Sequence, residues 1–234
     1  MKVVLCRRFH FEAAHRNLSA PAGAMAARLH GHSYIATVDV AGPVDENAGW
    51  LIDFADFKSA CAPIIAQLDH RMLNDVEGMR DTSREDIQRW LVERLAIAVP
   101  GFAGCTVDVE GDVAFAPLVG HIGTAVEPRE RMEFGFAAAH FLPQLPADHR
   151  CRRLHGHSFR VVIDTRDSQS TVARLSELYE QLDHQLLNDV PGLENPTAEH
   201  LARWLWKSLD ARRAPIEKLM IRETCTTTCI YRGE

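Results

Sequence analysis

Alternating hydrophobic and polar positions predict strands at matching places in the two halves of the chain. The segments FHFEAAH (9–15) and HSYIATVDVAG (32–42) combine this period of two with β-branched residues, which is typical of half-buried strands. The residues AGPVDENAG (41–49) predict a hairpin loop, and WLIDF (50–54) predicts a strand that returns from it. A further strand is predicted by CTVDVEGDVAF (105–115).

Apolar residues at helical spacing predict two helices in each half. In the first half they span 55–69 and 82–99, and the second of them opens with a Thr or Ser cap and Glu85 in its first turn. In the second half they span 172–182 and 196–211, followed by a strand pair in KLMIRETCTTTCIY (218–231). This order predicts an α+β fold, with an antiparallel four-stranded sheet in each half covered by two helices on one face.

The second half of the chain repeats the first. FHFEAAH (9–15) matches FGFAAAH (134–140) at five of seven positions, and LDHRMLNDVEG (68–78) matches LDHQLLNDVPG (182–192) at eight of eleven. RLHGHS also occurs twice, and 15 residues separate His15 from His30 as they separate His140 from His155. We therefore predict two tandem modules, residues 1–122 and 123–234, joined within 111–131. The second module lacks a counterpart of GWLIDF.

Composition narrows the functional class. The formal net charge of −6 does not indicate a nucleic-acid binder, and no stretch is long and apolar enough to cross a membrane. The first residues lack the apolar core of a signal peptide. Six cysteines in 234 residues are too few for a disulfide scaffold, so we expect reduced thiols in a cytoplasmic protein.

The repeated His-Gly-His motifs are candidate metal ligands. Residues two apart on a strand point to the same face, so the outer histidines of each motif project side by side, and a third comes from the preceding strand. Three neutral imidazoles with an open fourth position suit a catalytic zinc ion. The alternative is that each is a core histidine bonded to the backbone, but the pattern occurs twice at one spacing. The predicted ligands are His15, His30 and His32, and His140, His155 and His157.

Cys151 is a candidate proton carrier. It lies in HRCRRLHGH, beside Arg150, Arg152 and Arg153, and positive neighbours lower the pKa of a thiol. Two other interpretations stay open: a small buried hydrophobic residue, or a fourth zinc ligand that would close the site.

An aspartate precedes a histidine in both copies of LDHxxLND, at Asp69–His70 and Asp183–His184. A carboxylate beside an imidazole suits proton transfer, although adjacent residues rarely bond each other and a helix-end cap is an alternative. Glu223, in a predicted strand, would need a partner if buried, and the flat edge of a heterocycle with adjacent N–H donors is a natural one. Cys225 and Cys229 form a lone C-x3-C, too little for a second metal site.

The combination of FxFxAAH, CRRLHGHSF, LDHxxLND, NPTAE and ETCTTTCIYRGE resembles the 6-carboxytetrahydropterin synthases of queuosine biosynthesis and the related 6-pyruvoyltetrahydropterin synthases. The resemblance covers nearly the whole chain, as two copies of the family unit. It implies tunnelling-fold modules that close into a barrel, zinc on the histidines, and a pterin triphosphate as substrate. A four-module barrel would need two chains and three-module barrels three, so we expect a homo-oligomer.

The resemblance also assigns roles to individual residues. It makes Cys151 the catalytic cysteine, and it makes Asp69, His70, Asp183 and His184 its catalytic partners. The predicted substrate-binding glutamates are Glu223, Glu199 in NPTAE and Glu110 in the weaker match VDVEG. In this family the pocket lies between modules, so the dyad at a given cysteine comes from a neighbour.

The two modules differ where the chemistry is concentrated. The first has Ala26 where the family has the cysteine, and EGDVAF where the second has ETCTTTC. We therefore predict one complete active site per chain, centred on the second module, with the first as scaffold and dyad donor. The expected reaction converts 7,8-dihydroneopterin triphosphate into 6-carboxytetrahydropterin, acetaldehyde and triphosphate. The alternatives are the 6-pyruvoyl product, or a non-catalytic pterin- or metal-binding protein.

Overall fold

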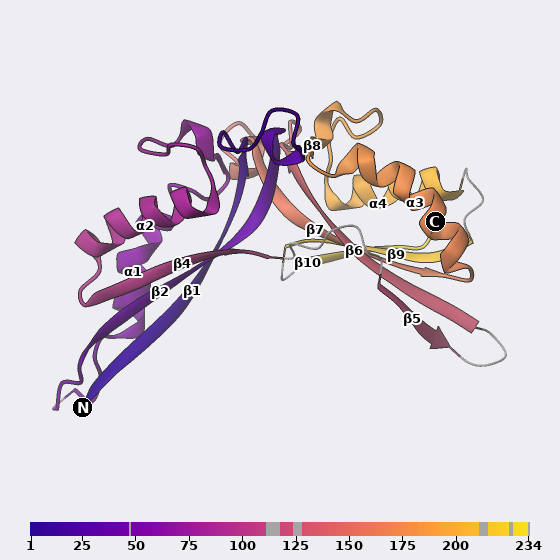
Figure 1. The fold of residues 1–234 in the computed structure, drawn as a ribbon. Coiled ribbons are helices and arrows are strands. Elements are labelled where there is room, and N and C mark those ends of the chain that lie inside the picture. Colours follow the sequence, from indigo (N-terminus) through magenta and orange to yellow (C-terminus); the bar gives the residue numbers. More distant parts are fainter. Residues whose placement is uncertain (47, 111–117, 124–127, 211–214, 225–226, 234) are drawn as a thin grey trace.

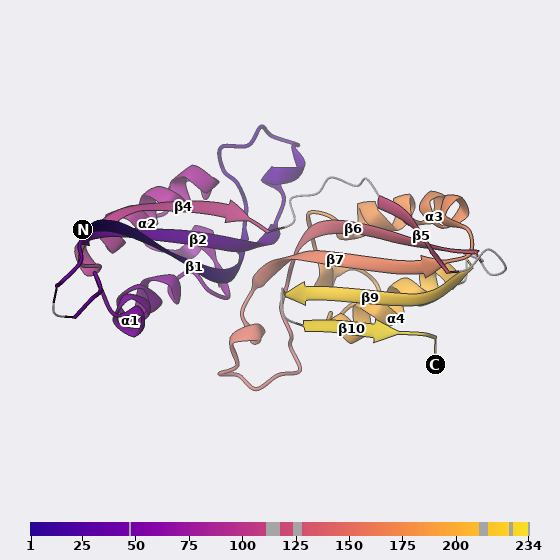
Figure 2. The same ribbon diagram turned by 90° about the horizontal axis from the view of Figure 1, so that it is seen from below.

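A computed structural model shows an arch of two modules that meet at its apex (Figure 1). It describes residues 1–46, 48–110, 118–123, 128–210, 215–224 and 227–233. In each module the helices cover the outer face of a sheet, and the strands are bare on the underside of the arch (Figure 2). This arrangement confirms the predicted α+β fold and its duplication.

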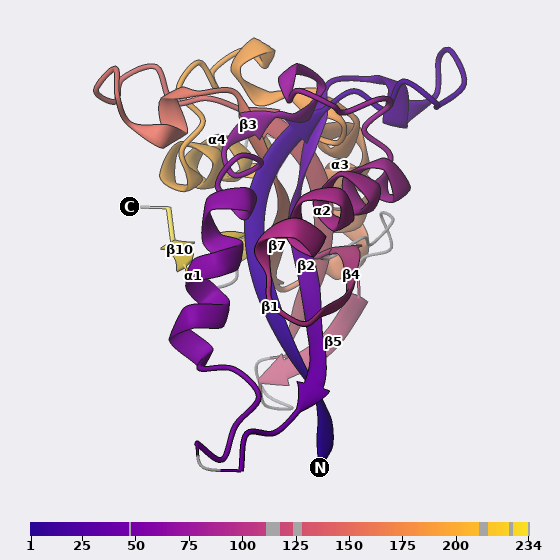
Figure 3. The same ribbon diagram turned by 90° about the vertical axis from the view of Figure 1, so that its left-hand side faces the viewer.

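The first module has a four-stranded sheet in the order β3-β1-β2-β4. β1, β2 and β4 are antiparallel, whereas the two-residue β3 runs parallel to β1, so the sheet is mixed. Both helices pack on one side of it (Figure 3). The elements are β1 (Lys2–His15), η1 (Met25–Ala27), β2 (His30–Pro43), α1 (Phe54–Ile65), β3 (Arg71–Met72), η2 (Leu73–Asp75), α2 (Arg84–Ala98) and β4 (Phe102–Val109).

The second module has a six-stranded sheet, in the order β10-β9-β7-β6-β5 with the short β8 beside β6. It exceeds the four strands predicted because β5, which precedes the repeat, and the two-residue β8 also pair with β6. The elements are β5 (Leu118–Gly123), β6 (Pro128–His140), η3 (Arg150–Arg152), β7 (His155–Thr165), α3 (Ser168–Leu182), β8 (Gln185–Leu186), η4 (Leu187–Asp189), α4 (Ala198–Asp210), β9 (Ile216–Thr224) and β10 (Thr227–Tyr231).

Two details differ from the prediction. WLIDF (50–54) is not a strand, because Asp53 accepts hydrogen bonds from the amides of Ala55 and Asp56 and so starts α1 at Phe54. The pairing of β5 with β6 places residues 118–122, assigned above to the first module, in the second sheet. The end of the predicted strand 105–115, from residue 111 on, lies outside the described residues.

Each module has its own hydrophobic core between sheet and helices. Phe11, Tyr34 and Trp90 are among the buried residues of the first core, and Phe134 and Phe159 are among those of the second. Because each core is formed within its own module, the strand ends at the apex can contribute side chains to a site shared by both modules.

Candidate active site at the module junction

Both His-Gly-His motifs lie at the apex of the arch, where β1 and β6 end and β2 and β7 begin (Figure 1). The strand register pairs His15 with His30 and His140 with His155. The last histidine of one strand therefore stands opposite the first histidine of the next, as the equal spacing of the repeats predicts.

The second-module cluster consists of His140, His155 and His157, which are buried and whose ligand atoms lie within 4.8 Å of one another. Nδ1 of His140 is 3.0 Å from the carbonyl of Pro196, and Nδ1 of His155 is 2.7 Å from that of Arg153. A carbonyl only accepts, so both Nδ1 atoms donate and both Nε2 atoms carry lone pairs. These two Nε2 atoms lie 3.1 Å apart, an arrangement that a shared cation stabilises.

The first-module cluster has the same construction. His15, His30 and His32 place their ligand atoms within 4.8 Å of one another. Nδ1 of His15 donates to the carbonyl of Thr82 at 2.9 Å, and Nδ1 of His30 donates to that of Arg28 at 2.8 Å. The Nε2 atoms of His15 and His30 again face each other, at 3.0 Å.

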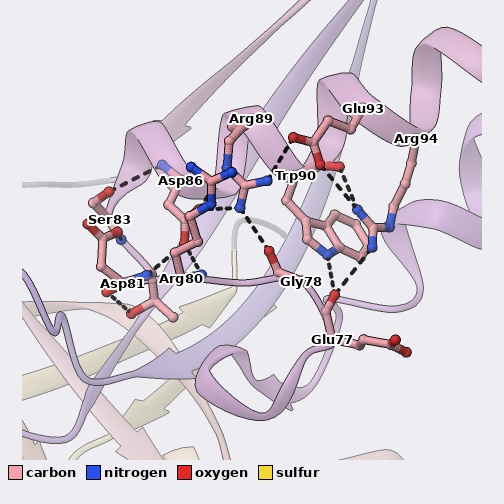
Figure 4. Close-up of polar contacts among 11 residues, drawn as sticks. Glu77, Gly78, Arg80, Asp81, Ser83, Asp86, Arg89, Trp90, Glu93 and Arg94 are labelled. Carbon is pink, nitrogen blue, oxygen red and sulfur yellow. Dashed lines mark hydrogen bonds and ion pairs between the residues drawn. The ribbon is translucent and has the colours of Figure 1, made fainter.

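A buried carboxylate holds the loop that orients His15. Oδ2 of Asp86 accepts from the amides of Arg80, Asp81 and Thr82 at 2.6, 2.9 and 3.1 Å, and Arg89 binds the other oxygen (Figure 4). Burial opposes the charge, but Arg89 and the three amides outweigh it and lower the pKa of Asp86 to about 2. Thr82, at φ 59°, is thereby fixed with its carbonyl toward His15.

Both clusters fit a divalent metal ion. Burial lowers the pKa of His15 to about 4 and that of His30 to about 3, and it also lowers the pKa of His155. These imidazoles are therefore neutral at pH 7, as a metal ligand must be. Three imidazoles whose ligand atoms lie within 4.8 Å of one another match the ligand set of a catalytic zinc; the identity of the metal stays a prediction.

The aspartate–histidine dyads cross over between modules. The ring of His70 stacks on His155 with 4.4 Å between centroids, and that of His184 lies 4.2 Å from His30. Backbone contact at the apex makes this possible, since a Cβ on Gly31 would come within 2.3 Å of Cα of Gly156. Each cluster is thus completed by the dyad of the other module.

The first dyad is fastened to a strand rather than to a helix end. Nδ1 of His70 lies 2.9 Å from Oδ1 of Asp69, and the amide of Glu12 donates to the same oxygen at 3.0 Å. The amide of His70 donates to the carbonyl of Glu12 at 2.6 Å. His70 has φ 54°, a left-handed conformation that turns the two adjacent side chains together. The helix-cap alternative therefore does not describe this carboxylate.

The second dyad repeats this arrangement on β6. Nδ1 of His184 is 2.9 Å from Asp183, and Asp183 accepts from the amide of Ala137 at 2.9 Å. The amide of His184 donates to the carbonyl of Ala137 at 2.6 Å, and His184 has φ 54°. Ala137 therefore occupies the place in the second module that Glu12 occupies in the first.

Cys151 lies in η3 beside the first module's dyad. The ligand atoms of His70, Cys151 and His155 lie within 4.8 Å of one another, and Arg150 binds Asp69 at 3.3 Å. Burial raises the pKa of the Cys151 thiol, and the opposing effect of Arg150 is smaller. This environment therefore favours the protonated thiol of Cys151 rather than the expected thiolate. In the first module the corresponding residue is Ala26, in η1, so the dyad of His184 has no equivalent thiol.

Glu223 reaches the second-module cluster from β9. Its Oε1 lies 3.2 Å from Nε2 of His140 and 3.3 Å from Nε2 of His157. Burial raises the pKa of Glu223, whereas a proton on His140 would lower it to about 2, and a cation bound between the Nε2 atoms would favour the charged form in the same way. The carboxylate is therefore ionised and placed at the centre of the site.

Of the other two predicted glutamates, Glu110 lines a cavity together with Glu223, and Glu199 lies elsewhere. In the first module, register places Val109 opposite Tyr34, where the second module has Glu223 opposite Phe159. Glu110 falls one position further, 3.9 Å from His10, and lines a cavity of about 80 Å³ between the modules. Glu199 is exposed in the first turn of α4. Cys225 of the C-x3-C lies outside the described residues.

The sequence interpretation missed Glu12. Its Oε2 accepts from Nδ1 of His157 at 2.8 Å, although the two residues belong to different modules. The only signal was the difference between FHFEAAH and FGFAAAH at this position.

A cleft beside the first module's dyad segment contains arginines from both modules. Its volume is about 400 Å³, and its lining includes Arg71, Asp75 and Glu77 of the first module and Arg153 of the second. The charges that line this cleft are therefore mixed.

Within the described residues, no helix has the length and apolar character needed to cross a membrane.

Comparison with known proteins agrees with this duplicated site. The sequence matches the 6-pyruvoyl tetrahydropterin synthase family twice, over residues 4–112 and 131–234. Because these matches span most of the sequence, the chain belongs to this family.

Relatives within the family carry different names. The chain is 40% identical over 116 residues to the 6-carboxy-5,6,7,8-tetrahydropterin synthase of Synechocystis sp., covering 42% of this chain and 88% of the relative. It is 33% identical over 101 residues to the dihydroneopterin monophosphate aldolase of Pyrococcus furiosus, covering 43% and 82%. The 6-pyruvoyl tetrahydropterin synthase structure from Caenorhabditis elegans is similar with a TM-score of 0.42 at 25% identity, covering 46% and 89%.

Proposed function

We propose that this protein is a zinc-dependent 6-carboxy-5,6,7,8-tetrahydropterin synthase with one complete active site, built around Cys151 by both modules. The observation that carries the proposal is the stacking of His70 on His155, with Cys151 within reach of both. This brings a thiol, a dyad, a metal cluster and the carboxylate of Glu223 to one place. The named synthase from Synechocystis sp. supports the choice of reaction.

His140, His155 and His157 would hold the metal, which as a Lewis acid would lower the pKa of hydroxyl groups on the substrate side chain. Because burial raises the pKa of Cys151, this thiol keeps its proton at neutral pH and is suited to donate one. His70, held by Asp69, is suited to accept one.

Substrate recognition falls to groups around this centre. The ionised Glu223 would exchange its imidazole contacts for the adjacent N–H donors of the pterin edge, a charge-assisted pair of hydrogen bonds. The triphosphate would lie toward the cleft lined by Arg71 and Arg153. Glu223 is the anchor in this proposal, and Glu110 lines the same small cavity between the modules, whereas Glu199 is exposed on α4.

Assembly and location complete the proposal. β4 ends the first sheet, and β10 and β5 end the second, which leaves strand edges open to pairing. We expect two or three chains to close a barrel, and light scattering that finds a stable monomer at micromolar concentration would contradict this.

A cytoplasmic location is supported by the free thiols of Cys6, Cys61, Cys105, Cys151 and Cys229.

The test is incubation of the zinc-loaded protein with 7,8-dihydroneopterin triphosphate, followed by mass analysis of the products. We expect 6-carboxytetrahydropterin with acetaldehyde and triphosphate. A 6-pyruvoyl product, with the carbon side chain intact, would assign the related reaction instead. No turnover by zinc-loaded protein would favour a pterin- or metal-binding protein without activity.

A further inference from the structure

Glu12 connects the first module to the metal cluster of the second. Its Oε2 accepts a hydrogen bond from Nδ1 of His157 at 2.8 Å and another from the hydroxyl of Ser33 at 2.6 Å. The side chain of His157 is 3% exposed and that of Glu12 is 12% exposed. The carboxylate is therefore held between two donors at a site where water has little access.

This contact distinguishes His157 from the other two ligands of its cluster. His140 and His155 donate their Nδ1 hydrogens to main-chain carbonyls, whereas His157 donates to a carboxylate. A carboxylate at Nδ1 fixes the hydrogen on that nitrogen, directs the Nε2 lone pair to the metal and makes the imidazole a stronger ligand.

The first-module cluster lacks this group. Glu12 pairs with Ser33 in the register of β1 and β2, and Ala137 pairs with Ser158 in that of β6 and β7. The two serines face each other across the junction, since each amide donates to the hydroxyl of the other at 3.3 and 3.2 Å. By this approximate two-fold symmetry, Ala137 is where a carboxylate for His32 would have to be.

We propose that Glu12 is a positioning residue that makes the second-module cluster the tighter of the two metal sites, and that Ala137 leaves the first-module cluster the weaker. This rests on the metal-binding part of the proposed function. It fits the other differences between the modules, because the first module has Ala26 where the second has Cys151 and Val109 at the end of β4, opposite Tyr34. The features absent from the first-module cluster thus include a ligand-orienting group as well as the reacting groups.

Zinc affinity measured one cluster at a time tests the proposal. In a His30→Ala chain, which keeps only the second-module cluster intact, competition with a chromophoric chelator should show that Glu12→Gln weakens zinc binding by about 10- to 100-fold. The visible spectrum of the cobalt-loaded protein should change as well, because the orientation of one ligand changes. The matched control is Glu12→Gln in a His155→Ala chain, where the remaining first-module cluster should keep its affinity.

The reciprocal variant tests the proposal by a gain of zinc affinity rather than a loss. Ala137→Glu in the His155→Ala chain should tighten zinc binding at the first-module cluster. If Glu12→Gln loses the native circular dichroism, this variant decides, and unchanged affinity overturns the proposal. If the unaltered protein binds zinc and Glu12→Gln binds it equally tightly, the role of Glu12 alone is overturned. An unaltered protein that binds no zinc overturns the proposed metal centre together with it.

Discussion

The crossing of the dyads predicts that His70 and His184 have unequal importance, although both bond to the preceding aspartate and share one backbone conformation. His70 lies against the cluster that has Cys151, whereas His184 lies against the one that has Ala26. We expect His70→Asn to lower kcat strongly and His184→Asn to leave it close to that of the unaltered chain. Asparagine is suitable because it tolerates the left-handed backbone at φ 54° that both positions adopt.

The size of the effect follows from what each change removes. Loss of a general acid–base group costs ~10²–10⁴ in rate, which corresponds to about 2.7–5.4 kcal/mol in the activation free energy. Each substitution also removes one Nδ1–aspartate hydrogen bond of 2.9 Å, worth about 0.5–1.5 kcal/mol of stability. Because the stability cost is the same at both positions, it cannot explain a difference in turnover.

Steady-state kinetics on the pterin triphosphate, with urea unfolding of the same preparations, measures both quantities. Equal loss of stability with a large difference in kcat is the expected result. A larger fall in kcat for His184→Asn than for His70→Asn would refute the assignment of the first module's dyad to the Cys151 site. It would place the second module's own dyad, or a copy from another chain, in that site.

Three further changes test other parts of the structure. Cys151→Ala should lower kcat by ~10²–10⁴ and leave the zinc content unchanged, as metal analysis would show; loss of zinc would instead make the thiol a ligand. Gly156→Ala places a Cβ 2.4 Å from Cα of Gly31 and should lower the free energy of unfolding by about 1–3 kcal/mol, whereas Gly104→Ala, with open space around it, should not. The lowered pKa of Asp86, about 2 against 3.8, stabilises the fold fully above pH 3.8, and this contribution is lost as the pH falls toward 2. Urea unfolding of Asp86→Asn should therefore show a weaker pH dependence between 4 and 2, and an unchanged dependence would contradict the role of this carboxylate.

Local sequence predicts most of the fold because hydrophobic periodicity and capping residues determine most of the helices and strands. The helices at 82–99 and 172–182 show their hydrophobic period locally, and both are confirmed, although α3 begins earlier than predicted, at Ser168 after its N-cap Asp167. The strand prediction for WLIDF failed because its apolar run resembles a strand, while Asp53 within it caps a helix that begins at Phe54. β5 could not be assigned to a module from the repeat, since it has no copy in the first half.

The site shows the limit of local sequence more clearly. The histidines were found because strand geometry alone places residues two apart on one face. The partner of Cys151 could not be found this way, because LDHRMLND and LDHQLLND are nearly the same. The choice between them depends on contact of Gly31 with Gly156, which brings together strands from different modules. Glu110 follows the last paired residue of β4, and only the approach of the second module shows that it lines a cavity with Glu223.

Covalent linkage of the two modules also changes how mutation can act on the protein. In an assembly of identical chains, an interface repeats the same residues on both sides, so one codon change alters every site at once. Here the two halves have separate codons, so Ala26 and Ala137 can each differ from their counterparts Cys151 and Glu12. Such a gene can lose one of its two sites by ordinary substitution while the other stays under selection. The site left behind is then free to vary, and the only residues it must keep are those that hold the apex together.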